Sequence, residues 1–239
     1  MALQDSTTGD SPLKLNRPHT VVVLAMSADG KISDVARSPG GFGSSADHQH
    51  LENQIAKADG LLWGAGTLRV DGNAEKDVDP TLSEQQQNQG KSPSPVQIVC
   101  TRSGEIDPKL KFFQQPEKRW LITTSQGAKN WQNRSEFERI IVLETETGAI
   151  DLVKALEELA SLNIKSLVVL GGGELVASLL KVDLIDEFWL TVCPLIIGGA
   201  KAPSPVDGEG FYWQTSPRLE LLSAERVEEE IFIHYRVKR

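Results

Sequence analysis

The sequence is poor in cysteine and has no long apolar run. Cys100 and Cys193 are the two cysteines among 239 residues. Both lie within apolar segments, which predicts reduced core thiols rather than a disulfide framework. The longest apolar runs, Val21–Met26 and Leu167–Leu170, are the length of strands and far short of the roughly 20 residues that cross a bilayer. Residues 1–18 are polar and lack the apolar core of a secretory signal. These absences predict a cytoplasmic protein with no membrane partner.

The sequence also lacks an excess of basic residues. Its 25 Lys and Arg against 33 Asp and Glu give a net charge of −8 at pH 7. This sign opposes binding to nucleic acid, whose affinity depends on neutralising many phosphates. We therefore expect no nucleic-acid partner, and we expect a smaller anionic ligand to be held by a helix N-terminus or a single Arg. The 4 histidines have no spacing suited to a shared metal site, so no metal is expected.

The sequence does contain a regular alternation of short apolar strands and amphipathic helices. The predicted strands are 20–26, 61–63, 96–100, 120–123, 140–143, 167–170 and 188–192, and the predicted helices are 47–58, 152–162 and about 174–181, with a helical turn at 128–131. Two more strands, 219–222 and 231–237, have no helix between them and predict an antiparallel ending. The pattern predicts an α/β fold with a mostly parallel central sheet, helices on both faces and an antiparallel C-terminal edge.

A polar segment interrupts the alternation at about residues 73–95. It is rich in Gln, Ser and Pro, and it has too little apolar surface to offset the entropy of ordering it. We interpret it as a surface insertion because the same alternation resumes beyond it; a linker between two domains is the alternative. The predicted organisation is a flexible tail at 1–16 followed by a single domain at 17–239.

Glycine follows directly after two of the predicted strands, at Gly64–Thr67 and at Gly171–Glu174. In an open parallel sheet, ligands bind at the carboxyl ends of the strands. Glycine there lets a phosphate approach the amides at a helix N-terminus. Two such corners predict a dinucleotide site. Glycines that serve only tight turns between strand and helix are the alternative.

A third strand end carries a cation and hydroxyl groups. Thr101, Arg102 and Ser103 follow the strand at 96–100. These donors suit a phosphomonoester such as the 2′-phosphate of NADPH, although a solvent-exposed Arg in a turn has the same sequence pattern. Thr124, at the end of the next strand, is a candidate hydroxyl for the adenosine half of the cofactor.

Six short strings occur in the order found in one enzyme family. They are Arg17-Pro18, Ala25–Ile32, Ala58–Thr67, Gly171–Leu175, Leu184–Glu187 and Pro194–Gly199. With these strings the sequence resembles, over about residues 17–237, the pyrimidine reductases of riboflavin biosynthesis, which are the reductase half of the bifunctional deaminase-reductase and its stand-alone relatives. The His-x-Glu and Pro-Cys-x-x-Cys strings of a zinc deaminase are absent, so a stand-alone reductase is expected.

The resemblance implies a dihydrofolate-reductase-like fold and a homodimer that acts on a small-molecule substrate. The implied activity is NADPH-dependent reduction of the ribosyl group of 5-amino-6-(5-phosphoribosylamino)uracil, or of a related pyrimidine, to a ribityl chain. Together with the strand ends above, it gives the predicted cofactor-binding residues: Ala25, Gly64, Gly66, Thr67, Val70, Arg102, Ser103, Thr124, Gly171, Gly172, Gly173, Glu174 and Leu175.

Three positions depart from this family by carrying apolar residues. Val23, Ile55 and Leu170 stand where the family usually has Lys, Arg and Glu. These polar groups are associated with the substrate, and each lost charged hydrogen bond costs about 1.5–3 kcal/mol. The alternatives to the riboflavin-pathway activity are therefore a reductase of a different heterocycle and a relative that binds the nucleotide without catalysis.

Hydride transfer needs geometry and a proton rather than a nucleophile. Asp71 and Ser27 are the predicted catalytic residues. Asp71 would deliver the proton directly or through water, and Ser27 would position an acceptor oxygen or satisfy its own turn. Asp29 has the same chemistry as Asp71, but it precedes Gly30 in a predicted turn, which favours a structural role.

Overall fold

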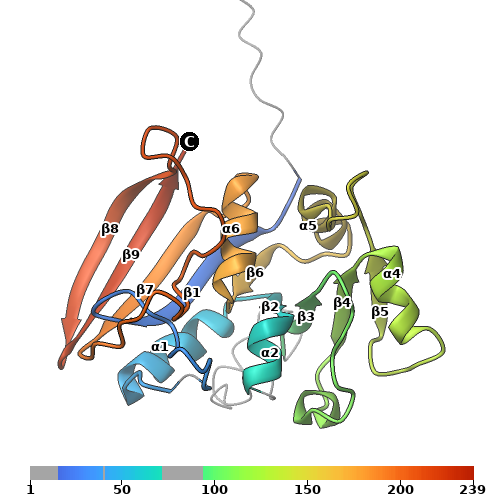
Figure 1. Ribbon diagram of the computed structural model, residues 1–239, viewed down its shortest axis with the longest axis horizontal. Helices are drawn as coiled ribbons and strands as arrows, with labels where there is room; N and C mark the ends of the chain where they lie inside the picture. Colours follow the sequence, from blue (N-terminus) through green and yellow to red (C-terminus); the bar gives the residue numbers. More distant parts are fainter. Residues whose placement is uncertain (1–15, 40, 72–93) are drawn as a thin grey trace, which may run out of the picture.

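The computed structural model describes residues 16–39, 41–71 and 94–239. The predicted tail at 1–16 and the predicted insertion at 73–95 lie almost wholly outside the described residues. A nine-stranded sheet with the order β5-β4-β3-β2-β6-β1-β7-β9-β8 forms the centre of the fold (Figure 1).

Strands β1 to β7 run parallel, and β9 and β8 join the sheet antiparallel. The strands are β1 (His19–Ser27), β2 (Gly60–Gly64), β3 (Val96–Cys100), β4 (Arg119–Thr123), β5 (Arg139–Val142), β6 (Ser166–Val169), β7 (Glu187–Cys193), β8 (Arg218–Val227) and β9 (Glu230–Lys238). The helices are α1 (Ser45–Ile55), α2 (Ala65–Asp71), α4 (Ser125–Ala128), α5 (Leu152–Ser161) and α6 (Gly173–Lys181), with 3-10 turns η1 (Lys111–Gln114) and η2 (Lys129–Trp131). The predicted sheet and its antiparallel ending are confirmed.

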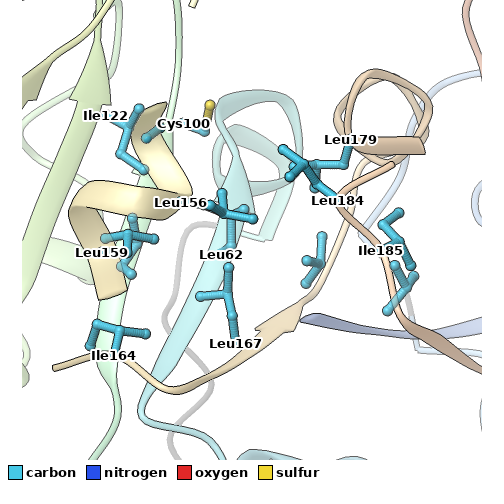
Figure 2. Close-up of a cluster of buried hydrophobic side chains, with 14 of the residues drawn as sticks. Leu62, Cys100, Ile122, Leu156, Leu159, Ile164, Leu167, Leu179, Leu184 and Ile185 are labelled. Carbon is cyan, nitrogen blue, oxygen red and sulfur yellow. The ribbon is translucent and has the colours of Figure 1, made fainter. Parts of the chain in front are cut away.

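Helices α5 and α6 cover one face of the sheet. Leu156 and Leu159 of α5 and Leu179 of α6 are fully buried against Leu62 of β2 and Leu167 of β6 (Figure 2). The predicted apolar stripe of α5 is therefore the stripe that packs on the sheet, and each such side chain contributes about 1.5–3 kcal/mol through burial.

Helices α1 and α2 pack against the other face. Ile55 of α1 lies in a cluster with Val23 and Trp63, and Leu68 of α2 packs on Val99 of β3. Helices thus cover both faces, as the sequence predicts. Within the described ranges, no helix is both long and apolar enough to span a membrane.

Three elements differ from the sequence expectation. Helix α2 is not among the predicted helices because Gly66 and the polar residues after it obscure its apolar face. The turn expected at 128–131 begins earlier, as α4 continuing into η2. Strand β8 is longer than the predicted 219–222. The sequence does not reveal its full length because it is a largely exposed edge strand, and burial therefore imposes no apolar alternation along it.

Asp186 anchors the start of the described domain. Arg17 donates to both of its carboxylate oxygens, at 2.7 and 2.9 Å. The Thr20 amide donates to it at 2.8 Å, and Arg239 Nη1 at 2.9 Å. Asp186 thus joins the start of β1 to the C-terminal residue Arg239.

We expect Asp186→Asn to destabilise the fold at neutral pH. Burial alone would raise the pKa of Asp186, but hydrogen bonds from Arg17, Thr20 and Arg239 lower it to about 2. A carboxylate with a lowered pKa stabilises the fold above its unfolded pKa of about 3.9 and loses that contribution as the pH falls towards 2. Urea denaturation should therefore give a free energy of unfolding about 2 kcal/mol lower for the variant at pH 7, with a smaller difference below pH 4. A difference independent of pH would contradict this account.

Candidate active site

The carboxyl ends of the parallel strands open into a cavity of about 1170 Å³. Ala25 of β1, Gly64 of β2, Arg102 after β3 and Gly171 after β6 all line it. The cavity is also lined by most of the other residues predicted for the cofactor: Gly66, Thr67, Val70, Ser103, Gly172, Gly173, Glu174 and Leu175. The structure thus brings the predicted corners together, and their role in cofactor binding stays a prediction.

The two glycine corners touch each other. The Gly64 amide donates to the Gly171 carbonyl oxygen at 2.7 Å. A Cβ atom on Gly64 would lie 3.1 Å from the Gly172 nitrogen, and Gly171 has a φ of 103° in the left-handed region. Gly64 is therefore required by the close approach of the backbone, and Gly171 by its backbone conformation. The two corners form one continuous surface.

The N-terminus of α6 is suited to an anion. Gly172 is its N-cap residue and makes no side-chain capping hydrogen bond. The first-turn amides of α6 therefore have no capping side chain as acceptor, and the positive end of the helix dipole favours a phosphate there. Thr67 lies beside this end, with its Oγ1 3.3 Å from the position of a Cβ on Gly172. The described residues accordingly fit the pyrophosphate of a dinucleotide.

Arg102 lies at the rim of the cavity with an exposed side chain. Its carbonyl oxygen accepts a hydrogen bond from Thr124 Oγ1 at 2.9 Å, and the same oxygen of Thr124 accepts from the Gly127 amide at 3.2 Å. Thr124 is only 3 % exposed and does not line the cavity. The contact predicted between Thr124 and the adenosine stays a prediction, and in the structure the Thr124 hydroxyl caps α4 and holds the Arg102 backbone.

Ser27 does not line the cavity either. It is fully buried, and its Oγ donates to Asp29 Oδ1 at 2.6 Å. The same Ser27 Oγ accepts a hydrogen bond from the Lys31 amide at 2.9 Å. Hydrogen bonds from Ser27 and from the amides of Ile197 and Gly198 lower the pKa of Asp29 to about 2. The catalytic role predicted for Ser27 does not fit this arrangement, and Asp29 has the structural role that its turn favours.

Asp71 is the last residue of α2, and its side chain lies outside what the structure describes. Its predicted catalytic role therefore stays a prediction. Among the described residues, no group of His, Cys, Asp and Glu side chains is arranged to hold a metal ion.

One end of the cavity is apolar. Val23, Ile55 and Leu170, the three residues that replace charged family positions, belong to one buried cluster with Trp63. Val23, Trp63 and Leu170 also line the cavity. The three replacements are mutually consistent, because an isolated charge in such a cluster would lose its hydration without gaining a partner.

Asp47, which begins the helix predicted at 47–58, also lines the cavity. The N-cap of α1 is Ser44 rather than Asp47, and the Asp47 amide donates to Ser44 Oγ at 3.3 Å. Burial raises the pKa of the half-buried Asp47 carboxyl, and a hydrogen bond from Thr191 partly opposes this. The sequence feature that could have marked Asp47 as a site residue is its position at the N-terminus of the helix that follows β1, because ligands bind at this edge of a parallel sheet.

Comparison with known proteins shows the family of the chain. The RibD C-terminal domain model matches residues 18–233. An Archaeoglobus fulgidus protein named 2,5-diamino-6-ribosylamino-4(3H)-pyrimidinone 5′-phosphate reductase is 30 % identical, covering 93 % of this chain and 100 % of that protein. A Methanothermobacter thermautotrophicus protein of the same name is 27 % identical over 93 % of this chain and 99 % of its own. The crystal structure of a pyrimidine reductase-like protein from Corynebacterium diphtheriae has a TM-score of 0.79 and 22 % identity, and the match covers 97 % of each chain. The chain therefore belongs to the RibD C-terminal domain family and is an oxidoreductase.

Proposed function

We propose that this chain is an NADPH-dependent reductase that converts the ribosyl group of a phosphoribosylamino-pyrimidine to a ribityl chain. The observation that carries the proposal is the meeting of two glycine corners and Arg102 in one cavity. The two relatives that match over almost their whole length are named as reductases of such a pyrimidine, which supports the substrate class.

The cavity residues have distinct roles in this proposal. The corners at Gly64 and Gly171 let the cofactor approach the backbone, and the first turn of α6 stabilises its pyrophosphate. Arg102 holds the 2′-phosphate that distinguishes NADPH from NADH, with Ser103 as a second donor.

The reacting groups lie at the other end. When bound, NADPH supplies the hydride. The small side chain of Ala25 leaves room for the nicotinamide ring at the end of β1, and Val23, Trp63 and Leu170 exclude water from the reacting carbon. The chain's contribution is therefore orientation, a dry site and a source for one proton.

The test is oxidation of NADPH by the purified protein in the presence of 2,5-diamino-6-ribosylamino-4(3H)-pyrimidinone 5′-phosphate or its deaminated counterpart. We expect oxidation with at least one of the two, and a product that has gained two hydrogen atoms in its sugar. Saturable NADPH binding with no oxidation by either substrate would overturn the proposal in favour of a non-catalytic nucleotide-binding protein.

We also infer that the chain forms a homodimer. Tyr212 and Trp213 are 83 % and 70 % exposed, and Leu221 on the edge strand β8 is 57 % exposed. The Trp213 ring lies 4.5 Å from the guanidinium carbon of Arg218, which begins β8, so this aromatic segment adjoins the edge strand. Exposed apolar surface next to an unpaired edge strand favours association with a second copy.

Light scattering tests the dimer. We expect about twice the 26.2 kDa mass of one chain, and we expect the double variant Tyr212→Ser and Trp213→Ser to shift the protein towards the monomer. A wild-type protein that remains monomeric at high concentration would contradict the inference.

A further inference from the structure

Asp47 lies in the lining of the cavity, which also includes the apolar side chains of Val23, Trp63 and Leu170. It belongs to the first turn of α1 and lines the cavity together with Leu51 and Trp63. The other described acids of the cavity lining are Glu174, in the first turn of α6, and Asp207, which accepts from the Ser204 amide and hydroxyl. Among the described residues, Asp47 is the lining carboxyl group that belongs to α1, the helix that follows β1 in the chain.

Strand pairing places Asp47 close to the end of β1. Its carboxyl group is hydrogen-bonded to the side chain of Thr191 in β7. Thr191 is 3 % exposed and pairs in register with Ala25. The proposed function puts the nicotinamide ring beside Ala25. The buried Thr191 hydroxyl, on the adjacent strand, therefore links the position of this ring to the Asp47 carboxyl group.

The surroundings of Asp47 keep it closer to its neutral form than an exposed Asp. Burial has the largest effect and raises its pKa, and the negative charge of Glu230 on β9 raises it further, whereas Thr191 and His48 act in the opposite direction. The Glu230 carboxylate is fixed, since it accepts from the Ser44 amide at 2.8 Å and from Ser44 Oγ at 2.6 Å. Cys193 of β7 also faces this group and stays neutral, because burial first and Glu230 second raise the pKa of its thiol to about 12.

We propose that Asp47 is a catalytic residue of this reductase and that its carboxyl group donates the proton that accompanies hydride transfer. The inference rests on the proposed function. When the ribosyl ring opens, the sugar carbon C1′ and the amine nitrogen share a C=N bond. With NADPH bound, C1′ would take up a hydride from the cofactor, the π electron pair of the C=N bond would move to nitrogen, and nitrogen would take the proton of Asp47. The cofactor is oxidised to NADP⁺, the substrate gains two hydrogen atoms, and the carboxylate regains a proton from water.

Gly43 offers a way to move the carboxyl group without removing it. Gly43 lines the cavity, and a Cβ atom built on it would overlap Asp47 Oδ2. A methyl group at this position must therefore displace the Asp47 side chain. The backbone of Gly43 is outside the left-handed region, so alanine introduces no backbone strain of its own.

The experiment compares Asp47→Asn with Glu52→Gln, the same carboxyl-to-amide change on the same helix but outside the cavity. We expect kcat of Asp47→Asn to fall about 10²- to 10⁴-fold, with the Kd for NADPH within about twofold of wild type. Glu52→Gln should keep the wild-type kcat. Gly43→Ala should lower kcat at least about tenfold with the acid still present.

The pH dependence gives a second measure. Because the protonated acid is the active form, wild-type kcat should fall as the pH rises through the pKa of Asp47 in the complex, and this limb should be missing in Asp47→Asn. Carbon-13 NMR of labelled Asp carboxyls, which needs no turnover, should contain one signal that titrates above the range of an exposed Asp and is absent in the variant.

Each outcome supports or overturns the inference. A wild-type enzyme with turnover and an Asp47→Asn variant that keeps both the rate and the pH limb would overturn the inference alone. A wild-type protein that oxidises no NADPH with either pyrimidine would overturn the proposed function and the inference together. If Asp47→Asn does not fold, an unchanged kcat in folded Gly43→Ala, or an Asp47 signal at the ordinary pKa, would overturn it.

Discussion

Replacing Arg102 by Ala is expected to raise the Kd for NADPH by about 10- to 100-fold and to leave the Kd for NADH almost unchanged. The two cofactors differ by the 2′-phosphate, and Arg102 is an exposed cation of the cavity lining whose backbone is held by Thr124. Among the described residues, no carboxylate forms an ion pair with its guanidinium, so the group is available to a phosphate. A charged hydrogen bond to phosphate contributes about 1.5–3 kcal/mol, which sets the size of the effect.

Arg69→Ala is the matched control for this variant. Arg69 also lines the cavity, but its guanidinium donates to the Glu105 carbonyl oxygen at 3.2 and 3.3 Å. Both variants remove one positive charge, so a general electrostatic effect would weaken NADPH binding equally in the two. Fluorescence titration with each cofactor separates these cases. Equal losses for NADPH and NADH in Arg102→Ala would show that Arg102 does not bind the 2′-phosphate.

Gly173→Ala is expected to destabilise the fold by about 2 kcal/mol and to weaken NADPH binding more than tenfold. Gly173 begins α6, and a Cβ atom on it would overlap the Ser204 carbonyl oxygen and approach the Asp207 carboxylate. Alanine improves helix propensity by up to about 1 kcal/mol, but overpacking against backbone costs about 1–3 kcal/mol or more. Since α6 must shift to relieve the overlap, its first-turn amides leave the pyrophosphate site.

Gly66→Ala is the control for stability. Gly66 lies in α2, and a Cβ atom on it would meet no atom within 4 Å. We expect this variant to unfold at the same or higher denaturant concentration than wild type, because only helix propensity changes. Urea unfolding of the three proteins gives the comparison. Equal stability of Gly173→Ala and wild type would contradict the packing described for the start of α6.

The sheet could be predicted from the sequence because burial on both faces leaves continuous apolar runs such as 61–63. The glycine corners could be predicted for a similar reason, since close backbone contact at Gly64 and a left-handed φ at Gly171 both favour glycine. Local chemistry of this kind is visible without knowledge of tertiary contacts.

The polar side chains were harder to place because their roles depend on which partners the fold brings close. In the sequence, Ser27 and Thr124 lie at the carboxyl ends of strands, where ligands bind to such a sheet. In the structure, the Ser27 hydroxyl instead donates to the Asp29 carboxylate, and the Thr124 hydroxyl donates to the Arg102 carbonyl oxygen. Asp47 is the converse case. Asp47 stands at the start of the predicted helix at 47–58, where an Asp commonly caps the helix. Its environment depends instead on Thr191 and Glu230, which are more than 140 residues further along the chain.

A crystal structure of the complex with NADPH tests the central claim most directly, because that claim is a position for each part of the cofactor. The account predicts the pyrophosphate at the first turn of α6, the 2′-phosphate against Arg102, and the nicotinamide ring between Ala25 and the Asp47 carboxyl. A reversed cofactor with its nicotinamide at Arg102, or an empty cavity at saturating NADPH, would contradict it.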